Sequence, residues 1–149
     1  MRYKSIAFSR SLIAMMIICG FLPKNAMAIN PVNEITIRND KGGNVARYVI
    51  KARKFRKEQK RIRFAGRCES ACTLLLAHPN HLICLTKSAK FGFHLPHSGL
   101  QQDNYKVSVE MMRTYPNWVS QWIRRTGGLK KTIHTMNYSY AKNYLQTCS

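Results

Sequence analysis

Hydrophobic and polar positions between residues 33 and 65 predict a strand, a helix and a second strand. Asn33 to Arg38 alternates between apolar and polar residues, which is typical of a short strand with one buried face. Asn39 to Gly43 supplies the residue types of a turn. Apolar residues then recur at helical spacing from Val45 to Phe55, and Asn44 is a residue type that caps such a helix. Arg61 to Ala65 forms the second predicted strand.

The stretch from Ala65 to Ala77, AGRCESACTLLLA, joins this strand to the next predicted helix. The chain passes through Gly66 and then enters an apolar, helix-favouring run from Ala71 to Ala77. Ser70 therefore lies at a predicted helix start, where the first backbone N–H groups have no partner within the helix and the helix dipole favours negative charge. A serine at this position either caps the helix or carries chemistry.

Short strands and turns are predicted after residue 77. Pro79-Asn80 is a turn signal, and the apolar segments Leu82 to Leu85 and Ala89 to His94 are strand candidates. Leu95 to Gly99 contains proline, serine and glycine and predicts a loop.

The C-terminal part of the chain is predicted to be helical. Pro116 restarts a helix, Gly127-Gly128 ends it, and a last helix is expected from about Leu129 to Leu145. Aromatic and methionine side chains recur at helical spacing and are expected in the core: Met111, Met112, Tyr115, Trp118, Val119, Trp122 and Ile123. The alternation of strands and helices predicts an α/β domain with a mainly parallel sheet.

The first 28 residues have the pattern of a secretory signal peptide. Basic residues precede an apolar run from Leu12 to Leu22, and the small-residue pattern Ala26-Met27-Ala28 follows. We expect cleavage after Ala28, which leaves residues 29–149 as one domain in the periplasm or outside the cell. An uncleaved anchor is the alternative, although the apolar run is shorter than the roughly 20 residues of a membrane span.

The mature chain is strongly basic. Loss of the signal removes four of the 25 Lys and Arg side chains, which leaves 21 basic and 6 acidic side chains and a formal charge of +15. Eight of the thirteen residues from Lys51 to Arg63 are Lys or Arg. This segment is either a solvated helix face that continues into a strand or a surface that attracts nucleic acid, lipid phosphates or acidic envelope polymers.

Four cysteines remain after signal removal, at positions 68, 72, 84 and 148. An even number in an exported chain predicts two disulfides, for which three pairings exist. We favour Cys68 with Cys72, on either side of the serine, and Cys84 with Cys148. Zinc binding by His78, His81 and Cys84 is an alternative, but no fourth ligand is evident.

Two further motifs favour chemistry at Ser70. The pair Gly42-Gly43 precedes the serine, and His94 follows it at the end of an apolar strand. A nucleophile, a general base and backbone N–H donors can converge if these three segments meet. The alternative for His94 is a strand-end histidine without a catalytic role.

In order and spacing, three motifs resemble those of the Clp-protease/crotonase superfamily, and most of all its exported Clp-like serine peptidase-like branch. They are Asp40-Lys41-Gly42-Gly43, Cys68-Glu69-Ser70-Ala71-Cys72 and Gly92-Phe93-His94, with His94 lying 24 residues after Ser70. The resemblance covers residues 33–97 and loosely the rest. It implies a fold of βα units, shortened here at the N-terminus, with a helical C-terminal part.

The resemblance also implies an activity and its residues. Ser70 would be the nucleophile, His94 the general base, and the N–H groups of Gly43 and Ala71 the oxyanion hole of a serine peptidase that needs no cofactor. Its substrates would be peptides or proteins, and the superfamily commonly forms oligomers.

The chain departs from the family pattern at the third catalytic position. The family's orienting acid would fall near Met136-Asn137, where no carboxylate is present, so Asn137 is the candidate to orient the histidine. A serine–lysine dyad is an alternative. The alternative function is an inactive Clp-like scaffold whose basic segment, Lys51 to Arg63, binds an anionic envelope component or a partner protein.

Overall fold

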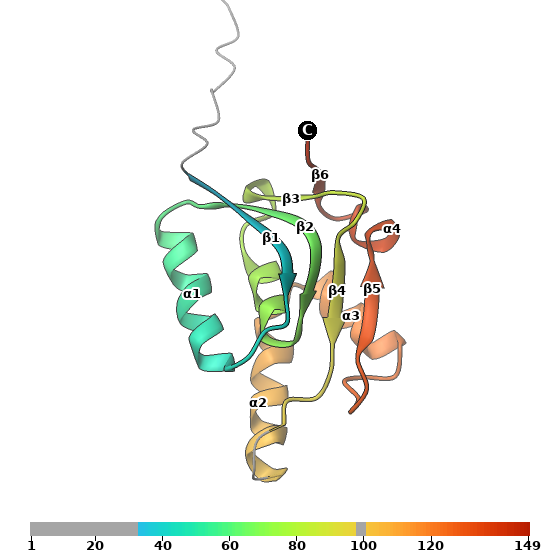
Figure 1. Ribbon diagram of the computed structural model, residues 1–149. Coiled ribbons are helices and arrows are strands. Elements are labelled where there is room, and N and C mark those ends of the chain that lie inside the picture. Colours follow the sequence, from blue (N-terminus) through green and yellow to red (C-terminus); the bar gives the residue numbers. More distant parts are fainter. Residues whose placement is uncertain (1–32, 98–100) are drawn as a thin grey trace, which may run out of the picture.

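The computed structural model describes residues 33–97 and 101–149 and confirms the α/β class (Figure 1). Six strands form a mixed, curled sheet. The predicted signal peptide, residues 1–28, lies outside the described residues. Within the described ranges, no helix has the length and apolar character needed to cross a bilayer.

The elements follow one another in this order: β1 (Glu34–Asp40), α1 (Val45–Lys57), β2 (Arg61–Glu69), η2 (Ser70–Ala77), η3 (Asn80–Leu82), β3 (Ile83–Leu85), β4 (Lys90–Phe93), α2 (Gln101–Thr114), α3 (Asn117–Arg125), β5 (His134–Asn137), α4 (Tyr138–Ala141) and β6 (Gln146–Thr147). The η elements are 3₁₀ helices.

Strand β2 is the centre of the sheet. It pairs with β1 over nearly its whole length, with β3 through its first half and with β4 through its second half. These three pairings and that of β3 with β6 are parallel, whereas β5 lies antiparallel to β4. Because β2 and β4 are parallel, the residues that follow them lie at the same edge of the sheet.

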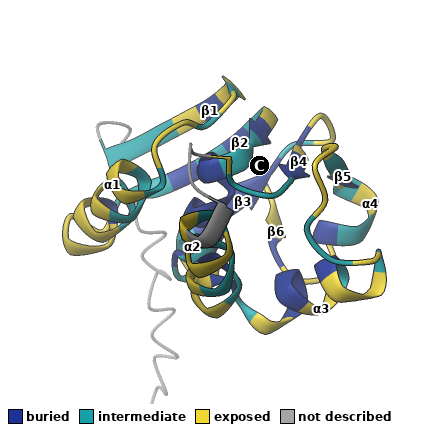
Figure 2. Cartoon of the chain, turned by 90° about the horizontal axis from the view of Figure 1, so that it is seen from below, coloured by how far each residue is buried: buried dark blue, intermediate teal, exposed yellow. Residues whose placement is uncertain are grey.

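The two faces of β2 differ in polarity. Ile62, Phe64 and Cys68 are buried beneath η2, while Arg63 and Arg67 alternate with them on the other face. Figure 2 shows α1 and α2 on the same side of β1 and β2. The polar face is therefore not covered by these helices.

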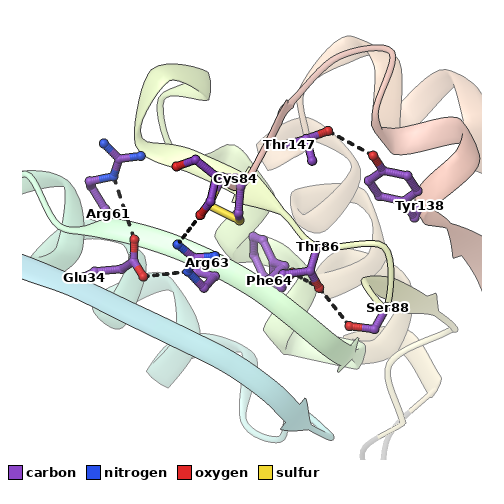
Figure 3. The surroundings of a disulfide bond; sticks show 11 residues. Glu34, Arg61, Arg63, Phe64, Cys84, Thr86, Ser88, Tyr138 and Thr147 are labelled. Atoms are coloured by element: carbon purple, nitrogen blue, oxygen red, sulfur yellow. Dashed lines mark hydrogen bonds and ion pairs between the residues drawn. A yellow bond between two sulfur atoms is a disulfide. The ribbon is translucent and has the colours of Figure 1, made fainter. Parts of the chain in front are cut away.

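Glu34 forms ion pairs at the start of this polar face (Figure 3). Its carboxylate lies 2.7 Å from Arg63 Nε and 4.0 Å from Arg61 Nε. The basic segment Lys51 to Arg63 thus divides between two surfaces, because its first part belongs to α1 and its last two arginines pair on the sheet.

The predicted end of the second strand at Ala65 is wrong, because β2 continues to Glu69. Gly66 permits this continuation. The β1–β2 register shifts between Ile37 and Asn39, and a Cβ at Gly66 would lie 1.9 Å from the Arg38 carbonyl oxygen. Only glycine tolerates so close an approach of two backbones, so Gly66 accommodates a bulge instead of ending the strand.

The predicted last helix, Leu129 to Leu145, is also wrong. Residues His134–Asn137 form β5, the short helix α4 follows, and Gln146–Thr147 forms β6. Pairing with β4 fills an otherwise open strand edge and buries Met136 to 1 % exposure. This tertiary pairing outweighs the local helical pattern.

Both favoured disulfides are confirmed. Cys68 is bonded to Cys72 across the β2–η2 junction, and Cys84 is bonded to Cys148 (Figure 3). The second bond fixes the end of the chain beside β3, where the Cys148 N–H also donates to the Leu85 carbonyl at 2.9 Å. Zinc binding through Cys84 is thereby excluded in the oxidised protein, because its sulfur is in a disulfide.

Candidate active site

Ser70 occupies a strained position between β2 and η2. Its φ is +54°, and among the described residues Gln59 is the only other non-glycine residue with positive φ. Such a conformation persists only when the surrounding structure holds it, and it is enriched at active sites. A sharp strand-to-helix turn of this kind exposes a nucleophilic serine in many hydrolases.

Gly42, the first residue of the glycine pair, lies against the serine. A Cβ built on Gly42 would lie 2.8 Å from the Ser70 Cβ and 2.7 Å from the Ala71 nitrogen. No side chain fits at this position, and the φ of +79° at Gly42 also favours glycine. The fold therefore brings two motifs that are distant in sequence into direct backbone contact.

Asp40 fixes the shape of the glycine turn. Its Oδ1 accepts a hydrogen bond from the Gly42 N–H at 2.9 Å and another from the Tyr48 hydroxyl of α1. Burial first, and then the neighbouring Asp40 carboxylate, raises the pKa of Tyr48 well above its usual range, so the phenol keeps its proton and remains a donor. Sequence reasoning treated Asp40 only as part of a motif, although an Asp two residues before a glycine is a known turn signal.

Two backbone N–H groups near Ser70 are unused. The Gly42 N–H is bonded to Asp40, whereas those of Gly43 and Ala71 have no acceptor within the described residues. The Ala71 N–H belongs to the first turn of η2, where helix geometry leaves N–H groups without partners. Both groups therefore lack an intramolecular acceptor among the described residues, as the donors of an oxyanion hole must.

His94 follows β4 at the same sheet edge as Ser70. The register pairs Glu69 with Gly92, so Ser70 leaves β2 beside Phe93 and His94 follows one residue further along. The His94 Nδ1 lies 2.6 Å from the Leu95 carbonyl oxygen. Since a carbonyl only accepts, Nδ1 carries the proton and Nε2 is left as a proton acceptor. No hydrogen bond joins His94 to the Ser70 hydroxyl within the part of the chain that the structure describes.

Asn137 is not brought to His94. It pairs with Lys90 at the opposite end of β4, on the order of 10 Å along the strand from His94. The Leu95 carbonyl makes the orienting contact that was expected of Asn137. No lysine among residues 33–97 and 101–149 makes a hydrogen bond to Ser70, and neither does His94, so this contact does not distinguish a serine–lysine dyad from a Ser70–His94 pair.

A hydroxyl pair missed from the sequence lies behind Ser70. Thr73 Oγ1 is 2.6 Å from the Ser70 carbonyl oxygen and 2.7 Å from the Tyr115 hydroxyl. The spacing of Thr73, three residues after Ser70, is a recognisable helix-start pattern. Tyr115 is distant in sequence and gave no local signal.

A cleft of about 1200 Å³ opens beside His94. It lies between the loop after β4, the helices α2 and α3, and the loop that follows α3, and its lining includes His97, Met112, Tyr115 and Leu129. The His97 ring centroid lies 5.7 Å from that of His94. The mostly apolar cleft therefore begins at Leu95, directly after His94, but among the described residues its lining includes neither His94 nor Ser70.

Comparison with known proteins adds no family assignment. The chain matches no protein-family model, and no curated protein has a significantly similar sequence.

Proposed function

We propose that this chain is an exported serine hydrolase that cleaves peptide bonds, with Ser70 as nucleophile and His94 as general base. The observation that carries the proposal is the positive φ of Ser70 at a strand-to-helix turn, in backbone contact with Gly42. The free N–H groups of Gly43 and Ala71 support an oxyanion hole at the same place. The order of these motifs supports Clp-protease-like units within the α/β fold.

In the acylation step, Ser70 is the nucleophile, His94 transfers the proton, and the two backbone N–H groups stabilise the oxyanion. Ser70 Oγ attacks the carbonyl carbon of the scissile bond, and His94 Nε2 takes the hydroxyl proton. The π electron pair moves to the carbonyl oxygen, which the N–H groups of Gly43 and Ala71 stabilise. Collapse of this oxyanion breaks the C–N bond, and the amine leaves with the proton from His94.

Deacylation repeats the sequence with water as the nucleophile. Water attacks the ester carbon and gives a proton to His94 Nε2, and the same N–H groups hold the second oxyanion. Collapse breaks the bond between carbon and Ser70 Oγ, the proton returns to the serine, and a carboxylic acid is released. The cycle consumes one water for each bond and requires no cofactor.

The two disulfides support a periplasmic or secreted location for this activity. Disulfides persist in oxidising compartments, and the Cys68–Cys72 bond closes directly around the serine.

Labelling with a fluorophosphonate probe tests the proposal. The probe phosphonylates activated serines, so wild-type protein is expected to become labelled and Ser70→Ala is expected to remain unlabelled. Ser139→Ala, which changes an exposed serine on α4, is the matched control and should label like wild type. Absence of labelling in correctly oxidised wild-type protein would refute the hydrolase.

A second candidate function rests on the outer face of α1. Arg47, Arg53 and Lys57 are exposed and have no carboxylate partner among the described residues, and Ile50 lies between them with 65 % of its surface exposed. A cationic helix face with an exposed apolar residue suits an anionic surface. The inactive-scaffold alternative would use this face to bind an anionic envelope component.

Vesicle binding distinguishes this second candidate. Phosphatidylglycerol vesicles should bind the wild type with a steep dependence on salt, and Arg53→Glu with Lys57→Glu should abolish binding while Ser70→Ala leaves it unchanged. Salt-independent binding, or equal binding to neutral vesicles, would exclude the anionic-surface function.

A further inference from the structure

Three oxygen atoms form a hydrogen-bonded chain behind the strained serine, and two of them belong to buried side chains. The Tyr115 hydroxyl lies 2.7 Å from Thr73 Oγ1, which lies 2.6 Å from the Ser70 carbonyl oxygen. Thr73 is fully buried, and Tyr115 is 4 % exposed. Water therefore does not compete for the buried bond between Thr73 and Tyr115, while the bond to the Ser70 carbonyl is partly buried.

The proton positions in this chain follow from chemistry. The Ser70 carbonyl has no proton to give, so Thr73 donates its single hydroxyl proton to it. Tyr115 must then donate to Thr73 Oγ1. Burial raises the pKa of Tyr115 far above its ordinary value, although the bond to Thr73 partly opposes this rise, so the phenol stays protonated and can act as the donor.

The Ser70 carbonyl and the Ala71 N–H belong to the same peptide group. That group is planar and trans, so its C=O and N–H point in opposite directions. A hydrogen bond that fixes the carbonyl toward Thr73 therefore fixes the N–H toward the opposite side, next to Gly42. The same bond draws electron density toward the carbonyl oxygen and makes the N–H a stronger donor.

Tyr115 also contacts the other half of the site. Its ring packs edge-on against Phe93, with ring centroids 5.6 Å apart, and Phe93 directly precedes His94. One side chain at the end of α2 thus supports both the peptide after the serine and the strand that carries the histidine.

We infer that Thr73 and Tyr115 are positioning residues that aim and polarise the Ala71 N–H as an oxyanion donor. The inference rests on the proposed hydrolase function for its catalytic meaning. Neither residue touches the reacting atoms, and both act through the peptide group between Ser70 and Ala71.

Three substitutions and one control test this role. Thr73→Val removes the hydroxyl and keeps the shape, Thr73→Ser restores a hydroxyl, and Tyr115→Phe removes only the phenol oxygen. Thr86→Val is the control, because Thr86 also donates to a backbone carbonyl, that of Phe64, but far from the serine. Each variant is compared with wild type by the second-order rate of fluorophosphonate labelling and by the ¹H–¹⁵N resonance of Ala71.

Loss of a full oxyanion donor costs about 100- to 1000-fold in rate, so a misaligned donor should cost less. We expect labelling to slow about 10- to 100-fold in Thr73→Val and about 3- to 10-fold in Tyr115→Phe, with the Ala71 amide proton shifted upfield in both. Thr73→Ser and Thr86→Val should label like wild type. Tyr115→Phe retains its ring packing, so it remains informative if Thr73→Val does not fold.

Two results would contradict different parts of this account. Wild-type labelling rates and an unshifted Ala71 amide in folded Thr73→Val and Tyr115→Phe would overturn it while leaving the hydrolase intact. An unlabelled wild type would refute the hydrolase instead. In that case a shifted Ala71 amide in Thr73→Val upholds the orienting role on the peptide, and an unshifted one refutes it.

Discussion

Gly42 lies against Ala71 so closely that a Cβ on the glycine would be 2.7 Å from the alanine nitrogen. The same Cβ would lie 2.5 Å from the Glu69 carbonyl oxygen. Because both atoms belong to the backbone, neither can move aside as a flexible side chain would. The site therefore depends on the absence of a side chain at position 42.

We predict that Gly42→Ala disrupts the site far more than an equivalent change elsewhere. Gly128 has the same φ of +79° but no atom within 4 Å of its built Cβ, so Gly128→Ala measures backbone strain alone. That strain should cost about 1–2 kcal/mol of unfolding free energy. Gly42→Ala should cost more and should also lose fluorophosphonate labelling. Equal losses of stability in the two variants, measured by urea unfolding, would contradict the contact.

His94→Ala is predicted to reduce labelling at least about 100-fold without unfolding the protein, because a general base contributes on that scale. The half-buried His94 lies beyond the end of β4, so its loss removes little core packing. His81→Ala is the control, because His81 is exposed on η3 and does not line the cleft. If His94→Ala labels at the wild-type rate, His94 is not the base.

The two disulfides are predicted to differ in their contributions to stability and reactivity. The cysteines of the Cys68–Cys72 bond are 4 residues apart in sequence and those of Cys84–Cys148 are 64 apart. From chain entropy, replacing both cysteines by alanine should lower the free energy of unfolding by about 2 kcal/mol for the Cys68–Cys72 pair and by about 4 kcal/mol for the Cys84–Cys148 pair. Only the Cys68→Ala/Cys72→Ala variant should also slow labelling, because its bond spans Ser70. The measurements are urea unfolding and labelling rates, and slower labelling in Cys84→Ala/Cys148→Ala would contradict this division.

His78 is predicted to make the protein less stable in mild acid. Burial, helped by the charges of Arg56 and His81, lowers the pKa of His78 below its ordinary value of 6.5, although the bond to the Lys60 carbonyl opposes the change. Above pH 6.5 the imidazole is neutral in both states and stability is complete. As pH falls below 6.5, the unfolded chain binds a proton that the folded chain excludes, and stability declines down to the folded pKa.

Urea unfolding between pH 8 and pH 5 measures this effect of His78. His78→Gln should reduce the decline, because its amide can still donate to Lys60 without titrating. His97→Gln, at an exposed histidine that does not act on the pKa of His78, is the control and should retain the wild-type decline. An unchanged pH profile in His78→Gln would show that other groups cause it.

Features set by short-range chemistry were predictable from the sequence. The helix cap at Asn44 is confirmed, since its side chain accepts from the Arg47 N–H at 3.0 Å. Gly42 and Ser70 are in contact, as their motifs predicted.

Features set by long-range pairing were not predictable. The strand β5 forms because the backbone groups on one edge of β4 would otherwise be unpaired. The register of this pairing then places Asn137 beside Lys90. Tyr115 reaches Thr73 only after α2 packs against η2, so no local pattern around residue 115 could reveal it. Hydrophobic periodicity indicates the secondary structure that a segment favours, whereas the strand or helix against which it packs depends on the rest of the fold.

The strand β6 and the bond from Cys148 to Cys84 bear on how the protein is made. Both join residues near position 148 to β3, in the middle of the domain. A growing chain can complete neither until residue 148 has left the ribosome, and the disulfide also requires oxidising conditions. These last contacts therefore form only after the rest of the domain has been synthesised, and a fusion partner placed after residue 149 would lie directly beside them.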